Sequence, residues 1–306
     1  MISGLISVGT NSTRAVVAEI QGGSGRVILQ RSTGTRIGEG LKERGHLDER
    51  AMQRTLDAIR DHYEAIRRMT HQIGAIATSA LRRADNAAEF IESVRQIIGS
   101  DLQVISGEDE ARYSYAGAVS GLEKHAGDHY GVADTGGGST EYAVGSSLQP
   151  DRLVSCEIGA VRLTEAVPEL AGHAGPVSDE SVERARSIAV AALAPIVSFQ
   201  RAERLVLVGG SATTTISVIA GQRMSSPYAE LPRAALQRTI AHLRSLDCET
   251  RKLMPGMNPQ RADILLAGEI VLDALLELTG HDAATVSTND ILLGCLLHRA
   301  SSPLVQ

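Results

Sequence analysis

The sequence predicts an α/β protein built from two halves that each open with a glycine-rich β-hairpin. A short apolar strand, a tip rich in small polar residues and a returning apolar strand occur at residues 6–20 and again at residues 130–144. After each hairpin, short apolar runs alternate with segments whose apolar residues recur at helical spacing. The repetition predicts two related subdomains that face one cleft.

The second hairpin carries the run Asp134-Thr-Gly-Gly-Gly-Ser-Thr-Glu141 at its tip. Consecutive glycines can adopt positive φ and bring several amides against one ligand, and such a nest suits a phosphate. Asp134, at the end of the entering strand, is placed to hold a metal ion or a water. On this run alone an ordinary glycine-rich turn is an equal alternative. The predicted phosphate-binding residues here are Gly136, Gly137, Gly138, Ser139 and Thr140.

The first hairpin reads Ile-Ser7-Val-Gly-Thr-Asn-Ser-Thr-Arg14. Its tip has the same kind of composition, and two such hairpins in one chain favour phosphate binding over a chance turn. The residues predicted to bind phosphate at this tip are Gly9, Thr10, Asn11, Ser12 and Arg14.

The elements that follow the first hairpin are predicted from periodicity and capping signals. Apolar residues at three-four spacing between Met52 and Ile66 predict a buried helix face. Asn86 and Glu89 have the spacing of a capping box that opens another helix. The remaining predictions are strands at 26–30, 73–77 and 102–105, and a helix at 108–120.

The second half is predicted to begin after the polar, turn-rich segment from Gly121 to His129. Ser178 opens an amphipathic helix that runs to Ile196. Further strands are predicted at 153–158 and 205–208, followed by helices that begin near residues 213 and 264. The last of these helices includes Glu269, Asp273 and Glu277, so it does not span a membrane.

Composition limits the classes of ligand. The chain has 306 residues, of which 43% are hydrophobic and 22% charged, and its formal net charge is −6. An acidic chain does not present a general polyanion-binding surface, so any affinity for phosphate is local. With no Trp and only two Phe, stacking platforms for single-stranded nucleic acid are not expected. We therefore predict no nucleic-acid partner and no membrane partner.

Cysteine usage and the N-terminus predict a cytoplasmic location. Cys156, Cys248 and Cys295 lie far apart and form no CxxC pattern. The start of the chain has no basic segment followed by a long apolar stretch, so no signal peptide is predicted.

Two residues outside the hairpins are candidates for catalysis. Glu110 lies in a helix-opening segment after a strand, where a carboxylate can project into a cleft, although acidic residues there also complement the helix dipole. For Glu108 and Asp109 we favour the dipole interpretation. Arg82 follows a strand and a turn of small residues, where a guanidinium can form paired bonds to phosphate oxygens. A P-loop (GxxxxGK[ST]) and a serine-hydrolase elbow (GxSxG) are absent from the sequence.

In order along the chain, several segments resemble the exopolyphosphatase and guanosine pentaphosphate phosphatase (Ppx/GppA) family of the actin-like ATPase and sugar-kinase superfamily. Besides the two hairpins, they are TSALRRADN at 78–86, ISGEDEAR at 105–112, GAVRLTE at 159–165, VGGSATT at 208–214, Arg261-Ala-Asp and Val286-Ser. The resemblance covers about residues 5 to 300, and the combination is more specific than any one segment.

The resemblance implies two ribonuclease-H-like domains with mixed sheets flanked by helices, over residues 1–122 and 123–289, and an active site in the cleft between them. It assigns the C-terminal helix, 290–306, to the first domain. It implies that Glu110 activates a water, that Arg82 neutralises phosphate charge, and that Asp134 holds Mg²⁺ or another divalent cation. It also implies polyphosphate or guanosine pentaphosphate as substrate, and a homodimer.

Ser7 departs from the family pattern, which has an aspartate at this position. Serine is a poor Mg²⁺ ligand, so half of the expected acidic pair is missing. The sequence therefore leaves two further hypotheses beside the phosphohydrolase: a polyphosphate- or alarmone-binding regulatory protein that has lost turnover, and a sugar or acid kinase of the same superfamily.

Overall fold

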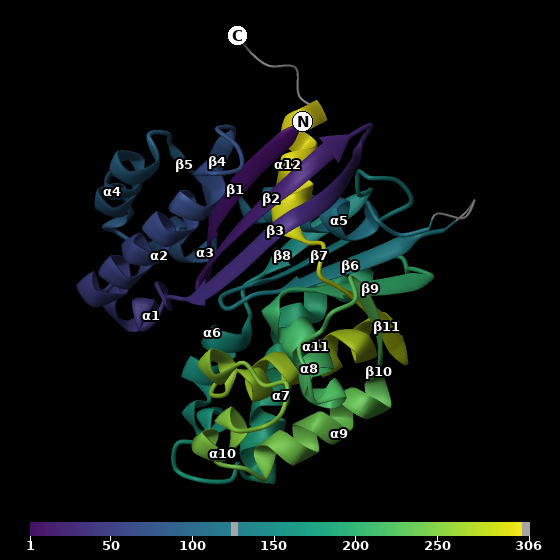
Figure 1. The fold of residues 1–306 in the computed structure, drawn as a ribbon. Helices are drawn as coiled ribbons and strands as arrows, with labels where there is room; N and C mark the ends of the chain where they lie inside the picture. The colour runs from purple at the N-terminus through teal and green to yellow at the C-terminus, as the bar shows by residue number, and fades with distance from the viewer. Residues whose placement is uncertain (124–127, 302–306) are drawn as a thin grey trace. The chain divides into compact units, whose positions relative to one another are not determined.

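The computed structural model describes residues 1–123 and 128–301, which form two compact units (Figure 1). Unit 1 consists of residues 1–123 together with residues 289–301, and unit 2 consists of residues 128–288. The predicted boundary at 121–129 lies partly outside the described residues, as does the end of the predicted helix 290–306.

Unit 1 contains a five-stranded sheet in the order β3-β2-β1-β4-β5. Its first three strands form an antiparallel meander, and β1 also pairs in parallel with β4, which pairs in parallel with β5. The strands are β1 (Ile2–Val8), β2 (Ser12–Gln21), β3 (Ser24–Gly34), β4 (Ile73–Ala77) and β5 (Leu102–Val104). The hairpin and the strands predicted in this half are confirmed.

Helices cover both faces of this sheet, which explains why its strands are apolar on both sides. Successive residues alternate between two cores: Ile6 belongs to the one that includes Met52 and Phe90, and Leu5 to the one that includes Tyr113 and Leu296. The first core is formed with α2 (Glu49–Arg67), α3 (Ser79–Arg83) and α4 (Ala87–Ile98), and the second with α5 (Gly107–Val119) and α12 (Ile291–Ser301). The short helix α1 (Leu41–Arg44) precedes α2.

The helices α5 and α12 approach each other to backbone contact. A Cβ on Gly117 of α5 would overlap the carbonyl oxygen of Asp290, and a Cβ on Gly294 of α12 would overlap that of Tyr113. Each helix therefore places a glycine where the other passes closest. Because α5 carries Glu110, the C-terminal helix fixes the element that presents this carboxylate.

Unit 2 contains a six-stranded sheet in the order β10-β11-β9-β6-β7-β8. Here β8, β7 and β6 form an antiparallel meander, and β9 pairs in parallel with β6. This repeats the arrangement in unit 1, where β3, β2 and β1 form the meander and β4 is parallel to β1. The predicted relationship between the two halves is thus visible in strand order and direction. The strands are β6 (Tyr130–Thr135), β7 (Thr140–Gly145), β8 (Arg152–Cys156), β9 (Arg204–Val208), β10 (Tyr228–Pro232) and β11 (Ala283–Ser287).

Unit 2 is organised around the central helix α11 (Leu265–Thr279), which is buried over most of its surface. Four other helices pack against it: α6 (Ala160–Ala166), α7 (Asp179–Leu193), α8 (Gly210–Ala220) and α9 (Arg233–Arg244). The remaining helical segments are α10 (Cys248–Lys252) and the 3₁₀ turns Pro168–Ala171, Ala194–Ser198 and Pro259–Arg261.

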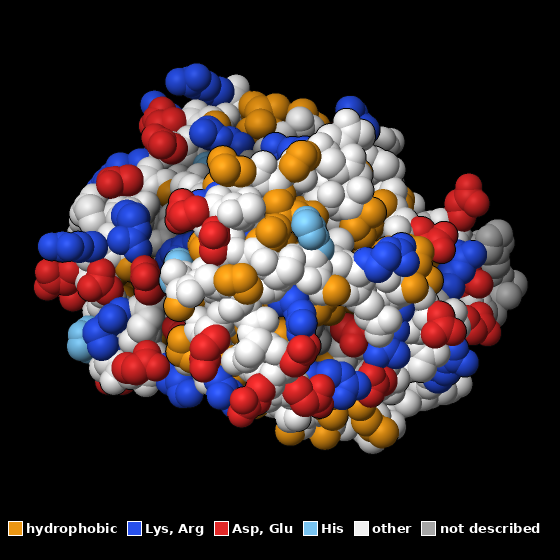
Figure 2. Space-filling model, turned by 90° about the horizontal axis from the view of Figure 1, so that it is seen from below, with side chains coloured by type: hydrophobic (Ala, Val, Ile, Leu, Met, Phe, Trp, Pro, Cys, Tyr) orange, Lys and Arg blue, Asp and Glu red, His pale blue; other side chains and the backbone are white. Residues whose placement is uncertain are grey.

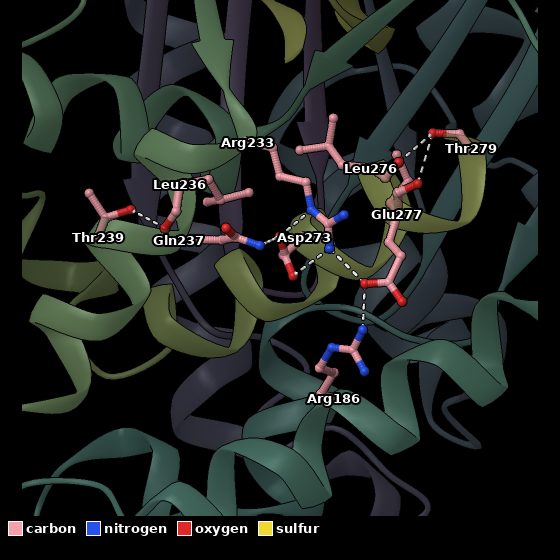
Figure 3. Close-up of polar contacts among 10 residues, drawn as sticks. Arg186, Arg233, Leu236, Gln237, Thr239, Asp273, Leu276, Glu277 and Thr279 are labelled. Carbon is pink, nitrogen blue, oxygen red and sulfur yellow. Dashed lines mark hydrogen bonds and ion pairs between the residues drawn. The ribbon is translucent and has the colours of Figure 1, made fainter. Parts of the chain in front are cut away.

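Ion pairs connect α11 to α7 and α9 (Figure 3). The guanidinium of Arg233 donates to Asp273 through Nε (2.7 Å) and Nη2 (3.2 Å), and Nη2 also donates to Glu277 (2.6 Å). Glu277 accepts a further bond from Arg186. These bonds lower the pKa of Glu277, with Arg186 as the largest cause, and raise that of Arg233, with Asp273 as the largest. Asp273 and Glu277 of this helix thus pair with arginines in the fold.

Three local predictions are wrong in detail. Asn86 precedes α4 as predicted but does not cap it, because its side chain bonds the backbone N–H and carbonyl of Leu47 instead (2.8 and 3.1 Å). The helix from Ser178 ends at Leu193, where Pro195 brings a 3₁₀ turn. The helix expected near residue 213 begins at Gly210, directly after a turn at Gly209.

Acidic and basic side chains are interspersed on the face shown in Figure 2, and no broad patch of one charge gathers among the described residues drawn there. Within residues 1–123 and 128–301, no helix has the length and apolar character needed to cross a bilayer.

Candidate active site

The two hairpin tips have the same backbone geometry. In the first, the N–H of Gly9 donates to the carbonyl of Ser12; in the second, Gly136 donates to Ser139, and both distances are 3.0 Å. The last strand pairs before each tip are Val8 with Thr13 and Thr135 with Thr140. The tips are therefore equivalent residue by residue.

The second tip rests on the N-terminus of α6. The carbonyl of Gly136 accepts from Ala160 (3.0 Å), and that of Gly137 accepts from Val161 (2.9 Å) and Arg162 (3.0 Å). The N–H groups in the first turn of α6, which have no partner within the helix, thus donate to the carbonyls of the tip. These carbonyls point to α6 and not toward a ligand. This contact gives the segment 159–165 its structural role.

The glycines of this tip do not adopt left-handed backbone. We expected positive φ from the glycine run, yet none of Gly136, Gly137 and Gly138 is among the positive-φ residues of the described chain. A Cβ on Gly159 would lie 2.7 Å from the carbonyl oxygens of both Gly136 and Gly137. Glycine is therefore needed at position 159, where the start of α6 meets the backbone of the tip. The hydroxyl of Thr140 also stays inside the fold, donating to the carbonyl of Ile158 (2.7 Å).

Asp134 lies at the end of β6, as predicted, and is 8% exposed. Its Oδ1 lies against the turn before α8, where a Cβ on Gly209 would come within 2.7 Å of it. Gly209 also has a φ of 93°, a conformation that favours glycine. The carboxylate is thus held close to the start of α8.

Glu141 is a candidate site residue that sequence reasoning missed. It lies directly opposite Asp134 in the β6–β7 ladder, so the two side chains share a face of the sheet. Glu141 is 2% exposed and accepts a hydrogen bond from Ser155 (2.7 Å). The sequence does contain a signal for Glu141. Asp134 and Glu141 flank the tip symmetrically, so a hairpin register places them opposite each other.

The pair Asp134 and Glu141 fits a divalent cation. Mg²⁺ is commonly bound by one or two carboxylates together with waters and substrate phosphates. No cluster of three or more His, Cys, Asp or Glu side chains suited to a metal occurs within the described parts of the chain. Two carboxylates do not complete the coordination of such a cation. The residues present therefore fit a cation that takes its remaining ligands from water and substrate oxygens.

The first tip is enclosed by the segment 35–38. The backbone N–H groups of Thr35 (3.1 Å) and Arg36 (2.9 Å) donate to the carbonyl of Asn11, and Gly38 donates to that of Thr10 (3.0 Å). Arg36 has a φ of 51°, which is unusual for a residue other than glycine and persists where surrounding contacts impose it. These contacts, which the sequence did not indicate, fix the backbone of the tip.

Ser7 and Arg14 lie side by side below the first tip. They are cross-strand partners in the β1–β2 ladder, and they share the sheet face of Leu5 and Val16, which is covered by α5 and α12. Arg14 forms an ion pair with Asp290. Ser7 is the structural counterpart of Asp134, so the residue that departs from the family pattern stands where the other tip has its carboxylate.

Arg82 and Glu110 are in direct contact, although they come from different helices. Nη1 of Arg82, on α3, donates to Oε2 of Glu110, on α5, at 2.9 Å, and to the carbonyl of Ile105 at 2.9 Å. The side chains are 21% and 11% exposed. A basic and an acidic group predicted separately thus form one partly buried pair in unit 1.

Asp109, another acidic residue at the start of α5, has local partners. Asp109 accepts from the hydroxyl of Ser106 (2.9 Å), its backbone N–H donates back to that hydroxyl (3.0 Å), and its carboxylate pairs with Arg112 (2.6 Å). Ser106 is the N-cap of α5. Asp109 thus bonds within the first turns of its own helix, whereas the carboxylate of Glu110 contacts Arg82.

Two mixed sheets flanked by helices, each with a phosphate-type hairpin, define a protein of the actin-like ATPase fold. The sequence model of the Ppx/GppA phosphatase family matches residues 16–298. The chain belongs to the Ppx/GppA phosphatase family.

Relatives of known name are similar over nearly the whole chain. Exopolyphosphatase 2 of Mycobacterium tuberculosis is 32% identical over 316 residues, covering 96% of this chain and 97% of that protein. A bifunctional 3-dehydroquinate synthase/phosphatase of Fusobacterium nucleatum is 28% identical over 304 residues; the match covers 95% of this chain and 46% of that protein, so the chain spans about half of its length.

A solved structure of an Aquifex aeolicus Ppx/GppA family member has a TM-score of 0.79 at 27% identity, covering 98% of this chain and 97% of that one. An exopolyphosphatase from Cytophaga hutchinsonii has a TM-score of 0.87 at 22% identity over 98% and 97% of the two chains, which shows the shared fold.

Proposed function

We propose that this chain is an exopolyphosphatase-type phosphohydrolase that releases terminal orthophosphate from inorganic polyphosphate or from guanosine pentaphosphate. The contact between Arg82 and Glu110 carries the proposal, because it joins a cation suited to phosphate oxygens with a carboxylate able to accept a proton. The similarity to an exopolyphosphatase over 97% of that relative's length supports polyphosphate as the substrate class.

In the proposed reaction, a water attacks the terminal phosphorus and the bond to the bridging oxygen breaks. Glu110 accepts the proton of the water, and the products are orthophosphate and a chain shortened by one phosphate. Arg82 orients the carboxylate and neutralises charge on the transferred group. Positioned proton transfer of this kind typically contributes about 10²–10⁴-fold in rate.

Each tip offers backbone N–H groups and hydroxyls to phosphate oxygens, and Arg14 adds a positive charge at the first. Asp134 and Glu141 are the residues that would hold a divalent cation. When bound, such an ion supplies charge neutralisation at the phosphate oxygens.

Phosphate release tests the proposal. Purified protein with Mg²⁺ is incubated with long-chain polyphosphate, guanosine pentaphosphate or ATP, and orthophosphate is measured over time. We expect steady release from polyphosphate, guanosine pentaphosphate or both, and much slower release from ATP. Release from none of the three would overturn the proposal.

A second candidate is a binding protein of the same fold with little turnover. Ser7 favours it, because the equivalent residue of the second tip is Asp134. The Ser7→Asp variant separates the two functions. A large gain of activity over a nearly silent parent supports the binding protein, whereas robust activity of the parent rules it out.

A further inference from the structure

Asp290 holds the guanidinium of Arg14. Nη2 of Arg14 and Oδ2 of Asp290 form an ion pair, with side-chain exposures of 22% and 6%. Partial burial and charge-assisted hydrogen bonding make such a pair more directional than a surface one. Arg14 is therefore constrained two residues after the tip residue Ser12.

The carboxylate that pairs with Arg14 comes from a residue far along the chain. The cross-strand neighbour of Arg14 has no carboxylate to offer. Ser7 faces Arg14 across the β1–β2 ladder and carries no charge. An acidic residue at position 7 would lie beside the guanidinium at cross-strand distance. Asp290, delivered by α12 to the same face of the sheet, provides the missing negative charge.

Asp290 is itself rigidly placed. Its Oδ1 accepts from the N–H of Leu292 (3.1 Å) and its carbonyl accepts from Gly294 (3.0 Å), so it caps the N-terminus of α12. The same carbonyl lies against Gly117 of α5 with no room for a Cβ between them. The anchor of Arg14 is thus built into the contact between α12 and the helix that bears Glu110.

We propose that Asp290 is a positioning residue for phosphate recognition, and that it fixes Arg14 in place of the carboxylate that Ser7 lacks. This inference rests on the proposed function, in which Arg14 contacts a linear phosphate chain. Holding the side chain in advance removes an ordering cost of about 0.5–1.5 kcal/mol on binding. That cost corresponds to about a two- to tenfold change in affinity.

The variant Asp290→Asn separates this role from capping. Asparagine caps helices as well as aspartate does, so α12 is retained while the charge is lost. Binding of inorganic tripolyphosphate is measured by calorimetry for the full chain, for Asp290→Asn, for Arg14→Gln and for the double variant, with melting temperatures of each. Asp48→Asn is the matched control, since Asp48 caps α2 of the same unit through the N–H of Ala51 (3.0 Å).

We expect Asp290→Asn to weaken tripolyphosphate binding about two- to tenfold, and Arg14→Gln to weaken it at least as much. The double variant should bind as Arg14→Gln does, because Asp290 acts through Arg14. In phosphate-release assays the KM of Asp290→Asn should rise with little change in kcat, and Asp48→Asn should match the wild type in both assays.

Unchanged or tighter binding by Asp290→Asn, or additive losses in the double variant, would overturn the inference. A chain that binds tripolyphosphate in this pattern but releases no orthophosphate would contradict the proposed function and leave the role of Asp290 intact. If Asp290→Asn hydrolyses polyphosphate as well as the wild type does, only the role of Asp290 is contradicted. A wild type that binds no tripolyphosphate would contradict the inference.

Discussion

Ser7 occupies in β1 the position that Asp134 occupies in β6. Each is the second residue before its tip glycine, and each faces one cross-strand partner, Arg14 for Ser7 and Glu141 for Asp134. The first hairpin therefore pairs a hydroxyl with a guanidinium, and the second pairs two carboxylates. Equivalent backbone geometry thus carries different side chains: a guanidinium that can bond phosphate oxygens beside the first tip, and two carboxylates that suit a divalent cation beside the second.

Loss of either carboxylate of the second hairpin should weaken metal activation. We expect Asp134→Asn and Glu141→Gln each to raise the Mg²⁺ concentration for half-maximal phosphate release about tenfold or more, because each removes a charged oxygen ligand. A Mg²⁺ titration of initial rates measures this, with the exposed Asp151→Asn as control. Unchanged half-saturation in both variants would show that these carboxylates do not hold the cation.

Removing the carboxylate that accepts the proton should affect turnover rather than binding. Glu110→Gln is expected to lower kcat about 10²–10⁴-fold while KM stays within a few-fold. The neighbouring Glu108→Gln, at an exposed position of the same helix turn, should behave like the wild type. Equal rates for Glu110→Gln and the wild type would remove Glu110 from the mechanism.

Gly159→Ala should distort the second tip, since its Cβ would lie 2.7 Å from two tip carbonyl oxygens. We expect weaker tripolyphosphate binding together with a lower melting temperature. Gly175→Ala is the control: its φ of 114° costs stability, but no atom lies within 4 Å of its Cβ. Equal affinities for the two variants would mean that the contact of α6 does not shape the phosphate site.

The stability of the protein should depend on pH through Glu269, which is fully buried in α11. Burial raises the pKa of Glu269 to about 8 from 4.5, although the hydroxyls of Thr215 and Thr239 and the charge of Arg251 oppose the shift. Because the folded pKa lies above the unfolded one, the stabilisation is complete below about pH 4.5 and is lost as the pH rises to about 8. Glu269→Gln removes this titration.

Urea denaturation at pH 5, 7 and 8.5 checks the effect of Glu269. The free energy of unfolding of the wild type, relative to Glu269→Gln, should be highest at pH 5 and should decrease toward pH 8.5. Parallel pH profiles for the two proteins would contradict the prediction.

Arg233→Gln should destabilise unit 2, because it leaves the carboxylate of Asp273, 11% exposed, without its paired cation (Figure 3). Breaking such a pair typically costs about 3–5 kcal/mol. Arg184→Gln removes a pair with Glu169 in which both side chains are about half exposed, and should cost far less stability because solvent screens the pair. Similar losses in the two variants, measured by urea denaturation, would show that burial of Asp273 adds nothing.

Local patterns predicted most of the elements, whereas contacts between distant segments escaped prediction. The two hairpins and the buried face of α2 were readable because strand alternation and helical periodicity are properties of short windows. Asn86 misled because its side chain bonds Leu47, a partner that no local spacing reveals. The positive φ expected of the glycine run does not occur, and the close contact of this tip with Gly159 joins segments that no local pattern brings together.

The candidate site follows the same division. Asp134 and Arg82 were identified from their places at strand ends, Glu110 was chosen over its acidic neighbours through the family resemblance, and the roles of all three remain proposals. The contact between Arg82 and Glu110 depends on how α3 and α5 pack, and the pairing of Arg14 with Asp290 depends on α12 returning to the first sheet. Such pairings follow from tertiary packing, to which a single sequence gives no direct access.

The return of α12 to unit 1 also sets an order of events during synthesis. Residues 128–288 leave the ribosome before residues 291–301, so unit 2 can complete its own core while unit 1 still lacks Leu292, Leu293 and Leu296. Until α12 arrives, this face of the first sheet is covered by α5 alone, and Arg14 lacks the carboxylate of Asp290. The candidate phosphate-binding tip of the first hairpin therefore gains its anchored arginine only after unit 2 has been synthesised.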